Sequence, residues 1–331
     1  MSVLKISSLV KRFNLEAGFF AHFGRFVNAV NDISFSIGRN EAYGLVGESG
    51  CGKTTTARML VRMYEADSGE ILYTQDDSTL NIANLKKEEL QQYRERVRYV
   101  FQDPARSLNP RMSVYEVLVS GCRKPLKKRG VSEEELRQKA AAILEEVGLQ
   151  EADLEKRPSE FSGGQRQRIS IARALLMEPD VLICDEVVSA LDVSIQGQIL
   201  NLLLDIRKKR NISFLFIAHD LKVACYFCDR IGVMYKGELM EEADAADLYI
   251  TGVHPYTKLL FSSAAGIPES NPINAQATAP CSPTPSAPAG EVLAGSCPFA
   301  PRCNMAAEKC SKEHPELREV KKGHLIRCFN C

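Results

Sequence analysis

The sequence GLVGESGCGKTTT at residues 44–56 constrains the fold most strongly, because it contains the spacing G-x-x-x-x-G-K-[ST]. The apolar residues 42–46 predict a buried strand before it, and residues 54–63 predict a helix after it. The apolar side of that helix comprises Met59, Leu60 and Met63. Glycines between a strand and a helix let backbone N–H groups surround phosphate oxygens, and the helix N-terminus attracts anions. The segment therefore predicts a phosphate-binding loop and not a chance glycine-rich turn.

Two side chains of this loop have chemistry of their own. Lys53 is expected to reach the β- and γ-phosphates of a nucleotide, and the Thr54 hydroxyl is expected to bind Mg²⁺. The residues expected to contact the nucleotide are Gly47, Glu48, Ser49, Gly50, Cys51, Gly52, Lys53, Thr54 and Thr55. Phe13, nearer the N-terminus, could stack on an adenine or fill the core.

Composition narrows the class of protein. The 331-residue chain has 42 Lys and Arg residues and 42 Asp and Glu residues, so its net charge gives no case for binding nucleic acid. It has no apolar run long enough to cross a bilayer, and Lys5, Lys11 and Arg12 interrupt any signal peptide. We therefore expect a cytosolic chain that would need partner subunits for a role at a membrane.

Strands and helices are predicted on both sides of the phosphate-binding loop. Residues 1–40 alternate apolar and polar positions, which indicates antiparallel strands. Residues 86–96 predict an amphipathic helix, and residues 98–102 predict a strand that ends at Gln102. Gln102 would then face whatever the loop holds.

A long helical stretch follows and predicts an inserted subdomain over about residues 104–176. Ser132 and Glu135 form a capping box at the start of one helix, and Gly148 is its expected end. The apolar stripe of this helix comprises Leu136, Ala140, Ile143, Leu144 and Val147.

A second helix start suited to anions lies at residues 160–168, EFSGGQRQR. Ser162, Gly163, Gly164 and Gln165 open that helix. Two anion sites in one chain need not face the same phosphate, so this one could serve the nucleotide of another subunit.

Carboxylates follow a strand later in the chain. The apolar strand predicted at 181–186 ends at Asp185 and Glu186, of which Asp185 suits Mg²⁺ and Glu186 can orient or deprotonate a water. Asp192 then precedes a helix, and another apolar strand leads to His219. Each signal is weak alone, but together with a phosphate-binding loop they form a set.

In this order, the phosphate-binding loop, Gln102, the Phe-Ser-Gly-Gly-Gln segment, Asp185-Glu186, Ser-Ala-Leu-Asp and His219 resemble the nucleotide-binding subunit of an ATP-binding cassette (ABC) transporter. The resemblance covers about residues 1–260. It implies an α/β fold of the ABC-type P-loop NTPases, with a RecA-like core, an antiparallel β-subdomain and a helical subdomain. It also implies a head-to-tail pair of subunits that encloses two ATP molecules.

The resemblance assigns roles within one subunit. It implies that Lys53 and Thr54 hold ATP and Mg²⁺, with Gln102 and Asp185 as further Mg²⁺ ligands.

The catalytic roles implied by the resemblance fall to three residues. Gln102 would sense the γ-phosphate, Glu186 would activate the attacking water, and His219 would fix both the γ-phosphate and that water. The opposing subunit would complete the site with Ser162, Gly163, Gly164 and Gln165, and Asp192 would lie at the seam between subunits.

The chain departs from the family pattern at two places. Phe161 stands where Leu is usual, an apolar change that we expect to be tolerated. Val187-Val188 replaces the usual Pro-Thr after Glu186, which could loosen the turn before Asp192 and change the rate of hydrolysis.

Further motifs narrow the resemblance to the ATPases of oligopeptide, dipeptide and nickel importers. They are residues 101–104 (FQDP), 107–112 (SLNPRM) and 254–257 (HPYT). The N-terminal segment resembles the second of the two ATPases in such systems. This implies a heterodimer with a homologous ATPase, docked on two permeases at the cytoplasmic face of the membrane, with an external solute-binding protein. Peptides are the expected cargo, and nickel or another small solute is the alternative.

Six of the 11 cysteines lie in the last part of the chain, from Cys281 to Cys331. A proline-rich linker is predicted at 261–296 and a cysteine-rich extension at 297–331. Its spacing resembles the C-terminal extension in which four cysteines hold a 4Fe-4S cluster, with zinc or unligated thiols as alternatives. The proposed ligands are Cys297, Cys303, Cys310 and Cys328, with Cys331 as a substitute for Cys328.

Three rival interpretations remain at this point. A cassette ATPase of translation or DNA repair usually has two cassettes or a basic coiled-coil insertion, and this chain has one phosphate-binding loop and no net charge. A regulatory subunit that binds ATP without cleaving it would not need Glu186 and His219, although Val187-Val188 keeps that interpretation open. An exporter fits the tail and the motifs less well than an importer.

Overall fold

A computed structural model describes residues 2–14, 26–75, 78–263 and 295–331. The first of its two sheets has four antiparallel strands in the order β2-β1-β4-β5. The bounds of these strands are Ser2–Asn14 (β1), Phe26–Gly38 (β2), Ser68–Gln75 (β4) and Ser78–Asn81 (β5). The antiparallel strands expected from residues 1–40 are therefore present.

The second sheet has eight strands in the order β11-β12-β10-β9-β3-β8-β7-β6. Their bounds are Ala42–Val46 (β3), Val97–Val100 (β6), Val181–Asp185 (β7), Ser213–Ala218 (β8), Arg230–Tyr235 (β9), Glu238–Asp244 (β10), Arg318–Lys321 (β11) and His324–Ile326 (β12). Strands β6, β7, β8, β3 and β9 are parallel, and β3, β7 and β8 are buried along their whole length. Such buried parallel strands explain their nearly unbroken apolar sequences.

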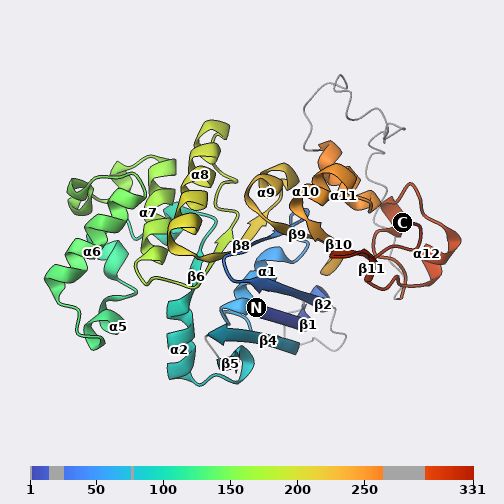
Figure 1. The fold of residues 1–331 in the computed structure, drawn as a ribbon, viewed down its shortest axis with the longest axis horizontal. Coiled ribbons are helices and arrows are strands. Elements are labelled where there is room, and N and C mark those ends of the chain that lie inside the picture. Colours follow the sequence, from blue (N-terminus) through green and yellow to red (C-terminus); the bar gives the residue numbers. More distant parts are fainter. Residues whose placement is uncertain (1, 15–25, 76–77, 264–294) are drawn as a thin grey trace, which may run out of the picture.

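Helix α1, Lys53–Leu60, lies between the two sheets and contacts β2, β7 and β8 (Figure 1). Helices α9, Leu221–Phe227, and α10, Ala245–Thr251, pack on strands of the large sheet. The sheet therefore has α1 and the small sheet on one side and helices on the other. None of the helices in the described ranges is both long and apolar enough to span a membrane.

Helix α2, Lys87–Arg96, lies beside the small sheet, and most of the other helices form one end of the molecule (Figure 1). They are α3, Pro104–Ser107; α4, Val114–Val119; α5, Arg123–Lys128; α6, Glu133–Glu146; α7, Gly163–Leu175; and α8, Val193–Arg210. The capping box of Ser132 and Glu135 begins α6, and Gly148 follows its end with φ of +77°. The predicted apolar stripe of α6 is buried.

Two predicted elements end earlier than expected. Helix α1 stops at Leu60, because the chain turns at Arg62, whose φ is +51°, and Met63 is exposed beyond it. Strand β6 stops at Val100, and Gln102 lies in the loop before Asp103, which caps α3. The predictions that Met63 lies on the apolar helix face and that Gln102 ends a strand were therefore wrong.

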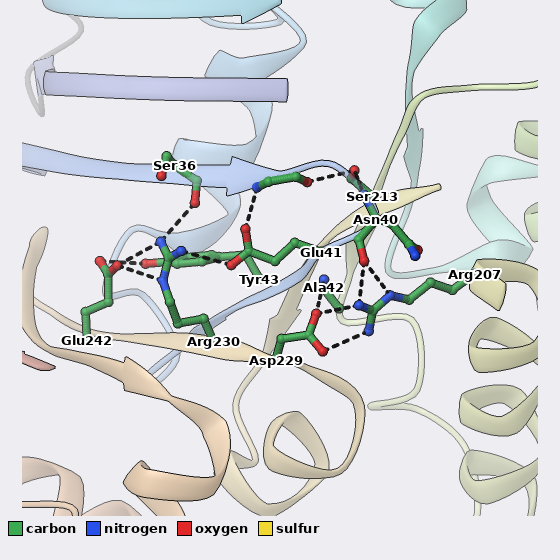
Figure 2. A network of polar contacts seen from close by, with 11 residues as sticks. Ser36, Asn40, Glu41, Ala42, Tyr43, Arg207, Ser213, Asp229, Arg230 and Glu242 are labelled. Carbon is green, nitrogen blue, oxygen red and sulfur yellow. Dashed lines mark hydrogen bonds and ion pairs between the residues drawn. The ribbon is translucent and has the colours of Figure 1, made fainter. Parts of the chain in front are cut away.

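A buried polar network ties the small sheet to the large one (Figure 2). The Arg230 guanidinium donates to Glu41 at 3.0 Å, to Glu242 at 2.9 Å and to the carbonyl of Ser36 at 3.0 Å. The Tyr43 hydroxyl donates to the other Glu242 oxygen at 3.1 Å. Arg230 on β9 thus joins β2, β10 and the residue before β3, and it supplies the cation that these two carboxylates need where they are removed from water.

A second part of this network holds the start of β3 (Figure 2). The Asp229 carboxylate accepts from the Ala42 N–H at 2.9 Å and from Arg207 at 3.2 Å. Arg207 also donates to the Asn40 carbonyl at 3.0 Å, and the Asn40 N–H donates to the Ser213 hydroxyl at 2.9 Å. These contacts fix the strand that leads directly into the phosphate-binding loop.

The C-terminal tail, defined as residues 295–331, packs against the large sheet. Strand β12 pairs antiparallel with β10, and β11 pairs with β12, so the tail extends the sheet by two strands. Phe299, Cys297 and Cys310 are buried in the same apolar core as β7 and β8. The tail also contains helix α12, Glu308–Lys312.

The predicted linker lies mostly outside the described residues. Helix α11, Pro255–Ser263, includes the first three residues of the predicted linker, 261–263. Residues 264–294, with Cys281 and six prolines of the predicted linker, lie outside the described ranges.

Candidate functional site

The phosphate-binding loop connects β3 to α1, as its sequence predicts. Two of its glycines are packed too closely for any side chain. A Cβ atom on Gly47 would lie 2.1 Å from the Met234 carbonyl oxygen, and one on Gly52 would lie 2.0 Å from the Ala29 carbonyl oxygen. Gly52 also has φ of +108°, which favours glycine. The spacing G-x-x-x-x-G is therefore required by packing as well as by ligand chemistry.

Lys53 is buried under this loop. Its Nζ atom donates to the carbonyls of Gly47 at 2.6 Å and Glu48 at 2.9 Å, and it lies 3.8 Å from the Cys51 sulfur. Burial raises the pKa of the Cys51 thiol, which keeps the thiol neutral beside the ammonium group. The ammonium group is therefore held inside the loop.

Thr54 and Asp185 meet where α1 begins and β7 ends. The Thr54 hydroxyl donates to one Asp185 oxygen at 2.9 Å, and the Tyr99 hydroxyl donates to the other at 2.6 Å. Burial and the neighbouring Asp185 carboxylate raise the pKa of Tyr99, so its hydroxyl stays protonated as a donor. Oxygen ligands of this kind suit Mg²⁺. Sequence reasoning missed Tyr99, although its place on the strand beside β7 is a signal.

Gln102 and Glu186 also lie together. The Gln102 amide nitrogen donates to a Glu186 carboxylate oxygen at 2.6 Å. Glu186 has φ of +48°, in the left-handed region that is uncommon for residues other than glycine. Strained backbone of this kind is often found at functional sites.

The turn after Glu186 is closed by hydrogen bonds. The Ser189 N–H donates to the Glu186 carbonyl at 3.1 Å, and the Ser189 hydroxyl donates to the same carbonyl at 2.9 Å. Val187 and Val188, which stand where Pro-Thr is usual, are both buried. His219 follows β8 and is exposed.

The Ser-Gly-Gly segment lies at the start of α7, among the helices of Figure 1. The Ser162 hydroxyl accepts from the Gln165 N–H at 3.3 Å, and the Gln165 side chain accepts from the Ser162 N–H at 3.0 Å. A Cβ atom on Gly163 would meet Leu191, and one on Gly164 would meet Ile195. Both residues lie near the start of α8, which Asp192 immediately precedes. The segment is thus packed on α8, whereas the phosphate-binding loop precedes α1 between the sheets.

Comparisons with known proteins place this geometry in a family. The model of the ABC transporter family matches residues 30–189, and that of the oligopeptide/dipeptide transporter C-terminal region matches residues 240–310. A putative peptide import ATP-binding protein of Brucella ovis is 43% identical over 303 residues, which cover 91% of each chain. This chain belongs to the ABC transporter ATP-binding proteins.

A second relative and a solved structure of an ATP-binding cassette are also similar to this chain. The oligopeptide transport ATP-binding protein OppF of Bacillus subtilis is 42% identical over 91% of this chain and 90% of its own. Among solved structures, the ATP-binding cassette MJ0796, described as a dimer in a post-hydrolysis state bound to ADP and Pi, aligns with a TM-score of 0.62. It is 27% identical and covers 73% of this chain and 98% of its own. The expected ABC-type P-loop fold is confirmed.

Phe13 lies at the end of β1 and is half-buried in this ABC chain. Its ring makes an edge contact with Tyr64 at 5.3 Å, and the Lys11 ammonium lies 5.5 Å from its centre. Phe13 is therefore not fully buried in the core, and its ring already contacts Tyr64 and lies beneath the Lys11 ammonium.

The tail cysteines are not arranged as a metal centre. Among the residues that the structure describes, no three His, Cys, Asp or Glu side chains are grouped so that they could hold a metal ion. The Cys331 thiol instead donates to the Cys328 sulfur at 3.0 Å, which lowers the pKa of Cys328. Cys328 and Cys331 form a Cys-x-x-Cys pair, whose spacing the sequence reasoning overlooked.

Sequence reasoning also missed the structural role of the segment HPYT at 254–257. His254 is buried, and its Nδ1 atom accepts from the Tyr256 N–H at 3.0 Å at the start of α11. The Tyr256 hydroxyl in turn accepts from the Glu48 N–H at 2.9 Å. The segment thus connects α11 directly to the phosphate-binding loop.

Proposed function

We propose that this chain hydrolyses ATP to power the import of di- or oligopeptides across the cytoplasmic membrane. The 2.9 Å contact of Thr54 with Asp185 carries this proposal, because it joins the end of the phosphate-binding loop to the strand that ends beside Glu186. Two relatives are named for peptide import and for oligopeptide transport, which supports peptides as the cargo.

Mg²⁺ fits the oxygens gathered at this point. The Thr54 hydroxyl and the Asp185 carboxylate would hold the ion, and Gln102 is proposed as a further ligand. When bound, Mg²⁺ would neutralise charge on the phosphates of ATP. Tyr99 would keep the Asp185 carboxylate in place by its hydrogen bond.

Phosphoryl transfer would use the remaining side chains as follows. Lys53 would exchange the Gly47 and Glu48 carbonyls for the β- and γ-phosphates. Glu186 would accept a proton from the attacking water as a new bond forms to the γ-phosphorus and the bond to the β,γ-bridging oxygen breaks. ADP and phosphate would leave, and His219 would hold the γ-phosphate from its exposed position after β8.

A homologous ATPase subunit is proposed to complete the site. Ser162, Gly163, Gly164 and Gln165 would bind the nucleotide of the opposing subunit through the start of α7. The exposed Asp192 and Val193, the latter 84% exposed, would lie at the seam. Phe13 would stack on the adenine, from its half-buried position at the end of β1.

Further partners follow from a transport role. We propose that the ATPase pair docks on two membrane permeases at the cytoplasmic face, and that an external solute-binding protein delivers the peptide. Selectivity would then lie outside this chain.

A growth and uptake experiment tests the proposal. The test uses cells of the source organism that lack this chain and cannot make one amino acid. These cells should fail to grow when that amino acid is supplied only within a peptide. The unaltered chain should restore growth, and Lys53→Ala should not. Restored growth with Lys53→Ala would contradict the ATP-driven role, and loss of nickel uptake with normal peptide use would favour the nickel alternative.

A separate proposal concerns the tail, where Cys297, Cys303, Cys310 and Cys328 would bind a 4Fe-4S cluster. Their spacing supports it, together with the hydrogen bond from the Cys297 N–H to the Cys310 carbonyl at 2.9 Å. The side chains would have to turn toward one another, with Cys331 as a substitute ligand and zinc as the alternative metal.

Metal content of the anaerobically purified chain tests this second proposal. Iron with acid-labile sulfide should be present and should be lost in Cys303→Ser, but not in Cys225→Ser, which lies outside the tail. If only zinc is found, the tail binds a structural zinc ion and not an iron–sulfur cluster. Protein without metal that still binds ATP would refute a metal site.

A further inference from the structure

The tail reaches the phosphate-binding loop through an ion pair. Arg302 donates from both of its terminal nitrogens to the two carboxylate oxygens of Glu48, each at 2.8 Å. Glu48 is the second residue of the loop and lies 254 positions earlier in the chain. Such a two-point contact fixes direction as well as distance, because the guanidinium fork matches the carboxylate.

Aromatic rings hold Arg302 in place for this contact. The guanidinium carbon lies 5.7 Å from the ring centre of Tyr235 and 5.8 Å from that of Phe299. Phe299, a tail residue that is 2% exposed, packs against Tyr235 and Tyr256 with ring centres 5.3 Å apart in each case. The segment of the tail that carries Arg302 is therefore anchored by a buried aromatic cluster.

The backbone of Glu48 is fixed from the same side. Its N–H donates to the Tyr256 hydroxyl at 2.9 Å, while its carbonyl accepts from Lys53 Nζ at 2.9 Å. The three groups of Glu48 thus bind Arg302, Tyr256 and Lys53. A displacement of Glu48 would move the ammonium group that is proposed to bind phosphate.

The charge of Glu48 gives a second reason for the ion pair. Glu48 is the one acidic residue in the sequence of the loop from Gly47 to Thr54. A carboxylate in a loop that surrounds phosphates would repel them, and the Arg302 guanidinium neutralises it.

We propose that Arg302 is a positioning residue of the ATP site, through which the C-terminal tail orients and neutralises Glu48. The inference rests on the proposed binding of ATP by the phosphate-binding loop. Arg302 itself does not touch the reacting atoms. It acts through Glu48, so its removal should weaken ATP binding more than it slows the chemical step.

A double-mutant cycle on the full-length, anaerobically purified chain tests this inference. The readout is the Kd of a fluorescent ATP analogue with Mg²⁺. Both side chains are about 40% exposed, at 42% and 40%, so the effect is that of a half-exposed pair. We expect Arg302→Gln to raise the Kd about threefold to fivefold. In a Glu48→Gln background, where no charge needs to be neutralised, the same change should alter the Kd less than about 1.5-fold.

Two further variants separate positioning from a general effect on the tail. Lys321→Glu breaks another tail ion pair, with Asp247 on α10 at 2.9 Å, and should leave the Kd unchanged. Arg302→Lys, which keeps the charge but not the two-point contact, should recover part of the affinity. In steady-state hydrolysis, Arg302→Gln should raise KM and leave kcat within about twofold.

The outcomes distinguish the role of Arg302 from the binding of ATP at the loop. Equal losses for Arg302→Gln in both backgrounds, or no loss in either, would overturn the role of Arg302 through Glu48. A Lys53→Ala variant that binds the analogue as tightly as the unaltered chain would overturn ATP binding at the loop, and this inference with it. Loss of binding in Lys53→Ala beside an unchanged Arg302→Gln would overturn only this inference.

Discussion

The amide nitrogen of Gln102 lies 2.6 Å from a carboxylate oxygen of Glu186. The two residues follow β6 and β7, which are parallel neighbours, so their loops leave the same edge of the sheet. Gln102 also leads into α3 and the other helices of residues 104–176. If the proposed γ-phosphate accepts a hydrogen bond from the Gln102 amide, this contact with Glu186 has to break, which would link ATP binding to the helices after Gln102.

The role proposed for Glu186 predicts a specific loss. Glu186→Gln should slow phosphate release about 10²–10⁴-fold, because an amide cannot accept the proton of the attacking water. ATP binding should persist, and ATP should be trapped in a stable pair with the partner ATPase. Rapid-quench measurement of phosphate checks this, with the exposed Glu88→Gln on α2 as the matched control. Unchanged turnover in Glu186→Gln would remove this residue from its role.

Gly52 provides a test of the packing of the loop. Gly52→Ala should abolish binding of the ATP analogue, because its Cβ would lie 2.0 Å from a backbone carbonyl oxygen that cannot move aside. Gly130→Ala is the control, since Gly130 also has positive φ, +84°, but no atom within 4 Å of its Cβ position. It should lose about 1 kcal/mol of stability and keep ATP binding. Equal ATP affinity in both variants would show that the loop adapts.

The local parts of the site could be predicted from the sequence. The phosphate-binding loop is a continuous segment, and its glycines, lysine and threonine are set by the turn from β3 to α1. The meeting of Thr54 and Asp185 also follows from sequence, because buried parallel strands deliver their C-terminal residues to one edge. The capping box of α6 needs only residues 132 and 135.

The contacts made by the tail could not be predicted in this way. Strand β11 is exposed at all four residues, so its sequence shows no alternation that would indicate pairing with a sheet. Arg302 and Glu48 are 254 positions apart, and nothing in either segment indicates the other. Early ends, such as that of α1 at Leu60, depend on tertiary packing that overrides helix propensity.

Arg230 should contribute strongly to stability. Replacing it by Leu would leave the buried Glu242 carboxylate and the half-buried Glu41 carboxylate without their cation, so the free energy of unfolding should fall by about 3 kcal/mol. Denaturant unfolding checks this. Arg106→Leu, which removes a guanidinium that is 91% exposed, should change the free energy by less than about 0.5 kcal/mol. A small effect for Arg230→Leu would mean that water replaces the guanidinium.

The folded chain should lose stability in weak acid because of His254. Burial lowers the pKa of His254 from its ordinary 6.5 to about 4 in the folded state. The unfolded chain therefore binds a proton at this histidine over a pH range in which the folded chain does not. Its contribution to stability is complete above about pH 7 and is lost as the pH falls from 6.5 toward 4, by about 2 kcal/mol at pH 5.

Denaturant unfolding at pH 7.5 and pH 5.0 tests the contribution of His254. Glu241 contacts the His254 backbone N–H at 3.1 Å and the His324 ring at 2.7 Å, so the control variant has to leave both contacts in place. His254→Asn is the matched control, because an Asn oxygen can accept the Tyr256 N–H that Nδ1 accepts now, while Glu241 and His324 remain. The unaltered chain should lose about 2 kcal/mol more than His254→Asn between the two pH values. Equal losses would mean that His254 is protonated in the folded chain as readily as in the unfolded one.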